Sequence, residues 1–166
     1  MGGAPDPRIR MLLDILDACY ARRGWHGTTL KGALRGMTPA AALWRPEPGR
    51  HNNWELALHT AYWKYRVRRR LLGDSSLQFE RPGANWPRLP RQPDASAWRR
   101  DLALLDLEHR RLKAAVESLS PALLGRRRPG ARWTPAEEIH GVAAHDAYHT
   151  GQIQLLKRLH EAGSPP

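Results

Sequence analysis

Near its carboxyl end the chain reads HDAYHTGQI over residues 145–153, with two histidines four residues apart. Side chains at i and i+4 of an α-helix lie on one face, about 6 Å apart along the axis, so His145 and His149 can reach one metal ion together. Val142 and Ile153 share that face, which turns the imidazoles toward a core. Neutral imidazoles that face inward suit a borderline divalent cation such as Zn²⁺ or Ni²⁺.

A third ligand must come from another segment, because two imidazoles do not make a tight metal site. In WELALHTAYWKY, residues 54–65, His59 shares a helical face with Leu56 and Trp63. Three histidines that leave coordination positions open are typical of a catalytic metal, whereas a structural zinc is usually closed by four ligands, often including Cys. The spacing alone leaves another interpretation open: hydrogen-bonded core histidines in a chain that has eight His.

The same stretch invites comparison with the HExxH motif of zinc metalloproteases, in which the Glu is the general base. Here the acid is Asp146, one methylene shorter, and no extended third-ligand motif follows it. We therefore interpret Asp146 as a group that hydrogen-bonds an imidazole or a neighbouring helix behind the metal ligands. Gln152, seven residues after His145, is a candidate either to orient a ligand or water or to bond a neighbouring helix.

Two more residues are candidates for a role in a reaction at such a site. Arg66 follows His59 by seven residues, at nearly the same azimuth two turns on, and could hold an anionic substrate. His109 is the one polar member of an apolar helical stripe and could serve as an acid or base. Each has an ordinary alternative: a surface or ion-paired arginine, and a hydrogen-bonded core histidine. His140 lies about 140° round the helix from His145, which argues against ligation.

Helix-start signals define the elements that must position these residues. Asp, Thr or Asn at an N-cap, followed by Pro or by Glu three residues on, marks a helix start. These signals predict helices from Pro7 to about Arg23, over residues 39–44, from Asn52 to about Leu72, from Asp94 or Ser96 onward, and from Pro135 to Ala162. Residues 73–93, rich in Pro, Gly and Arg, predict an ordered but irregular crossover.

The helix that begins near residue 95 has the clearest periodicity. Its apolar stripe, with steps of four and three residues, consists of Trp98, Leu102, Leu105, His109, Leu112, Val116 and Leu119. Such spacing is typical of a helix packed in a bundle. The composition agrees, because Leu, Ala and seven Trp supply the core while Val, Ile and Phe are scarce. We expect an all-α four-helix bundle that forms a single domain over residues 1–166.

Charge and composition narrow the class of partner. A formal net charge of +11 could indicate nucleic-acid binding, but the arginines are dispersed and their dense runs, at 66–70 and 126–128, are short and lack a known motif. The single Cys19 excludes an internal disulfide and fits a reducing compartment. No apolar run approaches the ~20 residues of a membrane span, and the amino end has no apolar leader. We expect a cytoplasmic protein without a membrane partner.

Four stretches together resemble the DinB family of metal-binding four-helix proteins, which are relatives of YfiT-type hydrolases and of bacterial thiol S-transferases. They are WHGTTLKGAL at 25–34, WRPEP at 44–48, NNWELALHTAYWKY at 52–65 and AAHDAYHTGQIQLLKRL at 143–159. The family signature is a His in the second long helix and H-x-x-x-H followed by G-Q-[IL] in the last. The resemblance implies that His59, His145 and His149 hold one divalent metal ion per chain, in an up-down-down-up bundle that is often a homodimer.

The resemblance says less about the reaction. Some relatives activate a low-molecular-weight thiol on the metal, as in bacillithiol or mycothiol transfer, and others are suspected hydrolases. We expect a metal-dependent hydrolase or thiol S-transferase that acts on a small molecule. The alternative is a non-catalytic metal-binding, small-ligand-binding or stress-response protein, and turnover would separate the two.

Overall fold

The computed structural model describes residues 6–22 and 24–163. Within those ranges all regular elements are helical, and pairing of the β type is limited to one isolated bridge between Gly24 and Gly27. The elements are α1 (Pro7–Tyr20), α2 (Leu30–Leu34), α3 (Pro39–Leu43), α4 (Asn53–Leu72), α5 (Ala95–Glu117), the 3₁₀ turn η1 (Pro121–Leu123) and α6 (Pro135–Gly163). The prediction of an all-α fold is confirmed.

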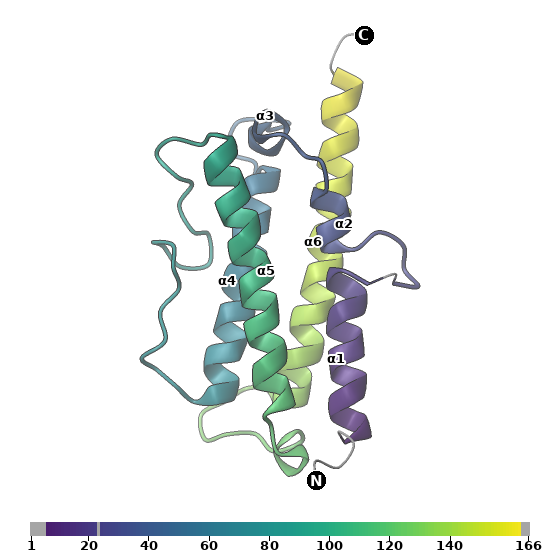
Figure 1. Cartoon of the computed structure of the whole chain (residues 1–166), viewed down its shortest axis with the longest axis vertical. Helices are drawn as coiled ribbons and strands as arrows, with labels where there is room; N and C mark the ends of the chain where they lie inside the picture. Colours follow the sequence, from purple (N-terminus) through teal and green to yellow (C-terminus); the bar gives the residue numbers. More distant parts are fainter. Residues whose placement is uncertain (1–5, 23, 164–166) are drawn as a thin grey trace.

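Four long helices lie side by side, and their directions follow from the order of the chain (Figure 1). Helices α1 and α6 run toward the end of the bundle where the C-terminus lies, and α4 and α5 run the opposite way. Helix α4 packs against α5 and α6, and α1 packs against the same two helices. Because α4 and α5 are parallel, residues 73–94 must return along the whole bundle, which is the predicted irregular crossover.

Local hydrogen bonds begin the helices where the sequence predicts. Asn52 and Glu55 form a reciprocal capping box on α4, with the Glu55 N–H donating to Asn52 Oδ1 at 2.9 Å. Asp94 caps α5 through a 2.7 Å bond from the backbone of Ala97. At the start of α6, the backbone N–H of Thr134 donates to Oε2 of Glu137 at 2.7 Å. These bonds satisfy backbone donors that a helix leaves unpaired.

Two details differ from the prediction. Helix α1 ends at Tyr20, not near Arg23, which lies outside the described residues. The segment that follows packs against the end of the helix, where a Cβ on Gly24 would lie only 2.7 Å from the carbonyl oxygen of Ala18. Helix α2 was not predicted, because five residues are too few to show a helical period.

The apolar core has two parts with a buried polar layer between them. One part gathers around Trp54 and Leu105, and the other around Leu16 and Leu112. The periodic stripe of α5 contributes to both parts, as its spacing predicts. Along α4, α5 and α6, the polar layer is formed by Lys64, His109 and Asp146, all buried. None of the helices in the described ranges is long and apolar enough to cross a membrane.

Candidate metal centre

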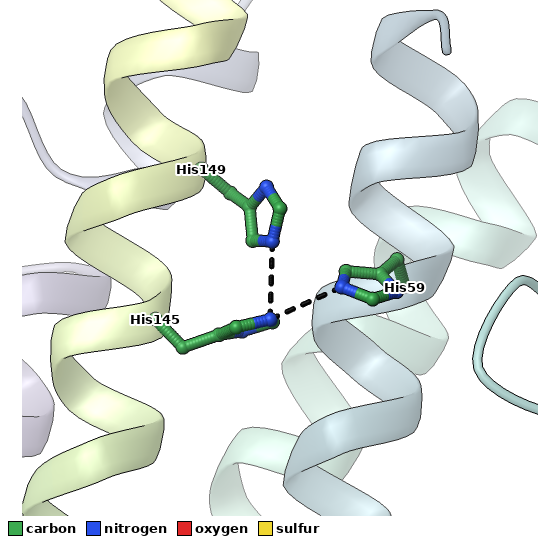
Figure 2. A group of neighbouring side chains, drawn as sticks. All are labelled: His59, His145 and His149. Carbon is green, nitrogen blue, oxygen red and sulfur yellow. Dashed lines mark hydrogen bonds between the residues drawn. The ribbon is translucent and has the colours of Figure 1, made fainter.

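Three imidazoles from two neighbouring helices meet at one point (Figure 2). His59 comes from α4, and His145 and His149 come from consecutive turns of α6. The Nε2 atom of His145 lies 3.1 Å from that of His59 and 3.0 Å from that of His149. Each ring offers one ligand atom within 4.8 Å of the others, so these three histidines could hold one metal ion. The sequence predicted this grouping.

Hydrogen bonds on the outer side of two rings fix which nitrogen faces the cluster. Nδ1 of His59 donates to the carbonyl oxygen of Asn85 at 2.7 Å, and Nδ1 of His149 donates to Oε1 of Gln152 at 2.6 Å. A neutral imidazole carries only one N–H, so the Nε2 atoms of both rings present lone pairs to His145. Such outer partners are typical of metal-binding histidines.

The cluster fits a cation better than it fits a set of hydrogen-bonded imidazoles. If His145 carries its proton on Nε2, it can donate to one neighbour and leaves the other lone pair unmatched. If the proton is on Nδ1, which is buried and has no partner, three lone pairs converge. Either tautomer leaves a buried acceptor unsatisfied, which is costly. A divalent ion that accepts all three lone pairs removes that cost, and three imidazoles suit Zn²⁺ or Ni²⁺.

Burial keeps the three rings in the form that binds metals. It lowers the pKa of His59 to about 4 and that of His145 to about 3, and it also lowers the pKa of His149. The hydrogen bond that His149 donates to Gln152 opposes the shift of the His149 pKa, without reversing it. Near neutral pH all three imidazoles are therefore uncharged, and protons do not compete with a cation for their lone pairs.

The crossover supplies contacts that sequence reasoning missed. The indole of Trp86 stacks on His59, with ring centroids 3.9 Å apart, and on His51 at 3.5 Å. Two rings cannot occupy the same face of one indole at those distances, so Trp86 lies between the two histidines. Asn85, in the left-handed backbone region with φ 51°, bonds His59 through its carbonyl and accepts from Trp63 through its side chain at 2.9 Å. The one signal was the unusual length of the crossover, since long ordered loops often carry functional residues.

Two pockets border the cluster. The first, of about 660 Å³, lies between α4 and α6 against His59 and His145, with Trp63 and Val142 among its apolar walls. The second, of about 550 Å³, shares no lining residue with the first and borders His149. A metal ion held by the three imidazoles would therefore be accessible from separate spaces, with coordination positions left for small molecules.

The structure gives Gln152 and Asp146 different places around the cluster. Gln152 bonds His149, one of its two predicted roles, and its amide nitrogen lies 3.1 Å from the hydroxyl of Tyr148. Asp146 forms an ion pair with Lys64 of α4, and both side chains are wholly buried. Of the two roles predicted for Asp146, the contact found is the one to a neighbouring helix.

His109 and Arg66 lie apart from both pockets. Nε2 of His109 bonds Asp17 at 3.0 Å, and its ring stacks on Tyr20 with centroids 3.9 Å apart, as in the alternative of a core histidine. The guanidinium of Arg66 lies over the ring of Tyr62 and borders neither pocket. We therefore give neither residue a part in the reaction proposed below.

The arginine beside the first pocket is Arg70, one turn beyond Arg66. A step of eleven residues from His59 returns a helix to nearly the same azimuth, about as closely as the seven-residue step to Arg66 does. The spacing therefore indicated Arg70 as well as Arg66. Only the position of the pocket along the helix axis distinguishes the two arginines.

His109 gives a prediction about the pH dependence of stability. Burial, followed by the charge of Lys64, lowers the pKa of His109 from 6.5 to about 4. Between those values the unfolded chain binds a proton that the folded chain does not, so the free energy of unfolding falls as pH falls from about 6.5 to about 4, by about 3 kcal/mol for this group. Urea unfolding of metal-free His109→Gln from pH 7 to pH 4 should therefore show a shallower loss of stability than the parent.

The matched control for this measurement is His26→Gln, because His26 is exposed in a loop. Its pH dependence should follow that of the parent. Equal slopes for His109→Gln and the parent would contradict the assignment of a neutral, buried His109.

The fold and the site define a class: an all-helical protein with three histidines that could hold a metal ion in its interior. The family model of the DinB superfamily matches residues 24–153, which include His59, His145 and His149. The chain belongs to the DinB superfamily. Neither the curated proteins nor the solved structures include a significant match to it.

Proposed function

We propose that this protein is a metal-dependent enzyme that brings a small nucleophile, water or a low-molecular-weight thiol, to a small electrophilic substrate. The observation that carries the proposal is the convergence of three imidazole Nε2 atoms beside two separate pockets. One Zn²⁺ or Ni²⁺ per chain would be held by His59, His145 and His149. When bound there, such an ion lowers the pKa of a coordinated water or thiol and polarises an electrophile.

The protein's own groups orient the reactants. Asn85 and Gln152 hold two of the imidazoles in the tautomer that directs Nε2 inward. Trp63 and Val142 give the first pocket apolar walls, which exclude water from a bound substrate. Trp86 and Tyr148 border the second pocket, next to His149. Two pockets at one site suit a reaction with two organic reactants, and this favours thiol transfer over simple hydrolysis.

The experiment compares two model reactions in one set of proteins. Parent, metal-free parent and His145→Ala are assayed for hydrolysis of 4-nitrophenyl acetate and for conjugation of 1-chloro-2,4-dinitrobenzene with cysteine, each with Zn²⁺ or Ni²⁺. We expect turnover that requires both the metal and His145, with conjugation accelerated more than hydrolysis. The exposed loop variant His26→Ala should behave as the parent does.

The outcomes separate the alternatives. Hydrolysis without conjugation would assign water as the nucleophile and reject the thiol. Bound metal without turnover in either reaction would contradict the enzymatic proposal and favour a protein that only binds a metal or small ligand.

We also propose that the chain forms a homodimer through an exposed face of α6 that borders the second pocket. Tyr148, Leu155 and Leu159 are exposed, and their spacing of seven and four residues places them on one face of that helix. An exposed apolar stripe of this kind is typical of helix pairing. Light scattering coupled to size exclusion should give the mass of two chains, and Leu155→Glu should give that of one.

A further inference from the structure

A further hollow adjoins the first pocket. A space of about 610 Å³ formed by residues 128–133, the segment that leads into α6, shares Trp63, Arg70, Trp133 and Glu138 with the first pocket. The two spaces adjoin at these four residues, and we treat them together. We call this the arginine cleft: its inner end borders His59 and His145, and its outer end is the hollow at 128–133.

The two ends of the arginine cleft differ in chemistry. The inner end is bordered by apolar and aromatic side chains, including Trp63 and Val142. Trp133, 48% exposed, lies where the two hollows join. The outer end is bordered by Arg70, Arg128 and Arg132. A ligand that fills the cleft therefore meets indole rings near the histidines and guanidinium groups farther out.

Glu138 positions two of the arginines at the outer end, but it cannot accept from all of their N–H donors. Glu138, largely buried, receives an N–H of Arg70 at 3.1 Å and lies 3.6 Å from Arg128. One carboxylate thus faces two guanidinium groups, each with five N–H donors, and both arginine side chains stay more than a third exposed. The guanidinium of Arg132 lies 4.9 Å from the ring centroid of Trp133.

The other carboxylate beside the cleft does not balance the positive charge of the arginines. The carboxylate of Glu137 is bonded to the backbone and hydroxyl of Thr134 at 2.7 and 2.8 Å, where it caps α6. Three arginines therefore border a cleft that has two carboxylates, one of which is already bonded within the first turn of α6. Such an excess of guanidinium groups favours oxyanions, two of whose oxygens arginine can bind through two parallel N–H bonds.

We propose that the arginine cleft selects substrates that join a flat aromatic or apolar body to an anionic group. The anionic group binds Arg70 and Arg128, and the body lies against Trp63 and Trp133, which directs its far end toward His59 and His145. The shared chemistry is an oxyanion, carboxylate or phosphate. This inference rests on the proposed function, because it names the substrate class of the same site.

Two dyes with one ring system test the proposal without an assay of turnover. 1-Anilinonaphthalene-8-sulfonate carries an anionic group, and N-phenyl-1-naphthylamine is its neutral counterpart. Fluorescence titration of the parent should show tighter binding of the anionic dye. Arg70→Ala combined with Arg128→Ala should weaken that binding about tenfold, as expected for lost charge-assisted bonds, and leave the neutral dye within about twofold.

Three further variants give the test its controls. Trp63→Ala should weaken both dyes, because it removes the aromatic wall. Glu138→Gln should tighten the anionic dye, because it removes the competing carboxylate. Arg100→Ala removes one positive charge from α5, where Arg100 borders none of the pockets described here, and should leave both dyes unaffected. Circular dichroism of each variant verifies that the helices are retained.

Displacement of the anionic dye then compares the two sources of oxyanion. Benzoate or phenyl phosphate should compete, and benzyl alcohol should not. Equal binding of the two dyes by the parent, or equal weakening by Arg100→Ala, would overturn the proposal. The titrations are run with and without Zn²⁺, so a cleft that prefers anions in a protein that binds no metal would refute the proposed function alone.

Discussion

His145→Ala protein is expected to purify with little bound metal, whereas the parent should contain about one ion per chain. His145 is the shared member of the cluster, because its Nε2 lies within 3.1 Å of the same atom of both other rings. Removal of this ligand leaves two imidazoles on different helices, which do not make a tight site. Elemental analysis of tag-free protein, prepared without chelator and then loaded with Zn²⁺ or Ni²⁺, measures the effect.

The fold should survive this substitution, since His145 is only partly buried and both apolar clusters stay intact. His140→Ala is the matched control: the residue is on the same helix and borders the same pocket, but it is not part of the cluster. Added Zn²⁺ should raise the melting temperature of the parent and of His140→Ala but not that of His145→Ala. An unchanged metal content in His145→Ala would refute the three-histidine site.

Lys64→Met is expected to cost about 3–5 kcal/mol of the free energy of unfolding, the usual effect of removing one partner from a buried ion pair. Lys64 and Asp146 are both wholly buried and bonded to each other, so the substitution leaves a carboxylate in the interior without its cation. Because Asp146 directly follows His145, the loss also removes a tie between α4 and α6 beside the cluster. Urea unfolding at neutral pH measures the change.

A double variant separates the cost of the lost pair from the cost of the stranded charge. Lys64→Met combined with Asp146→Leu should recover most of the stability, because neither charge remains in the interior. Lys31→Met is the control, since Lys31 forms a half-exposed ion pair with Asp106 and should lose about 1 kcal/mol or less. A double variant as unstable as Lys64→Met alone would show that shape, and not charge, determines the effect.

The features that the sequence predicted well are those encoded over three or four residues. The capping box of Asn52 and Glu55 is a local hydrogen-bond pattern, so its residue types are enough to place the start of α4. The pairing of His145 with His149 follows in the same way from helical geometry. His59 required one further step, the expectation that α4 packs against α6, and the bundle meets it.

The features that the sequence did not predict depend on contacts between distant segments. Asn85 and Trp86 belong to a crossover without a repeating pattern, and nothing in its composition indicates which of its residues turns toward His59. Lys64 was missed for a different reason. Lysine is almost never fully buried unless it is paired, and only the three-dimensional approach of Asp146 shows that it is.

The parallel course of α4 and α5 has a consequence for how the site and the fold depend on each other. A helix of 20 residues is about 30 Å long, and about nine extended residues would be enough to return along it. The crossover of residues 73–94 is more than twice that long, and its surplus reaches inward to hold His59. Part of the crossover therefore connects the two helices, and another part supports the site. A variant with a shorter crossover could keep the bundle and lose the carbonyl group to which His59 donates, so the fold does not depend on this support of the site.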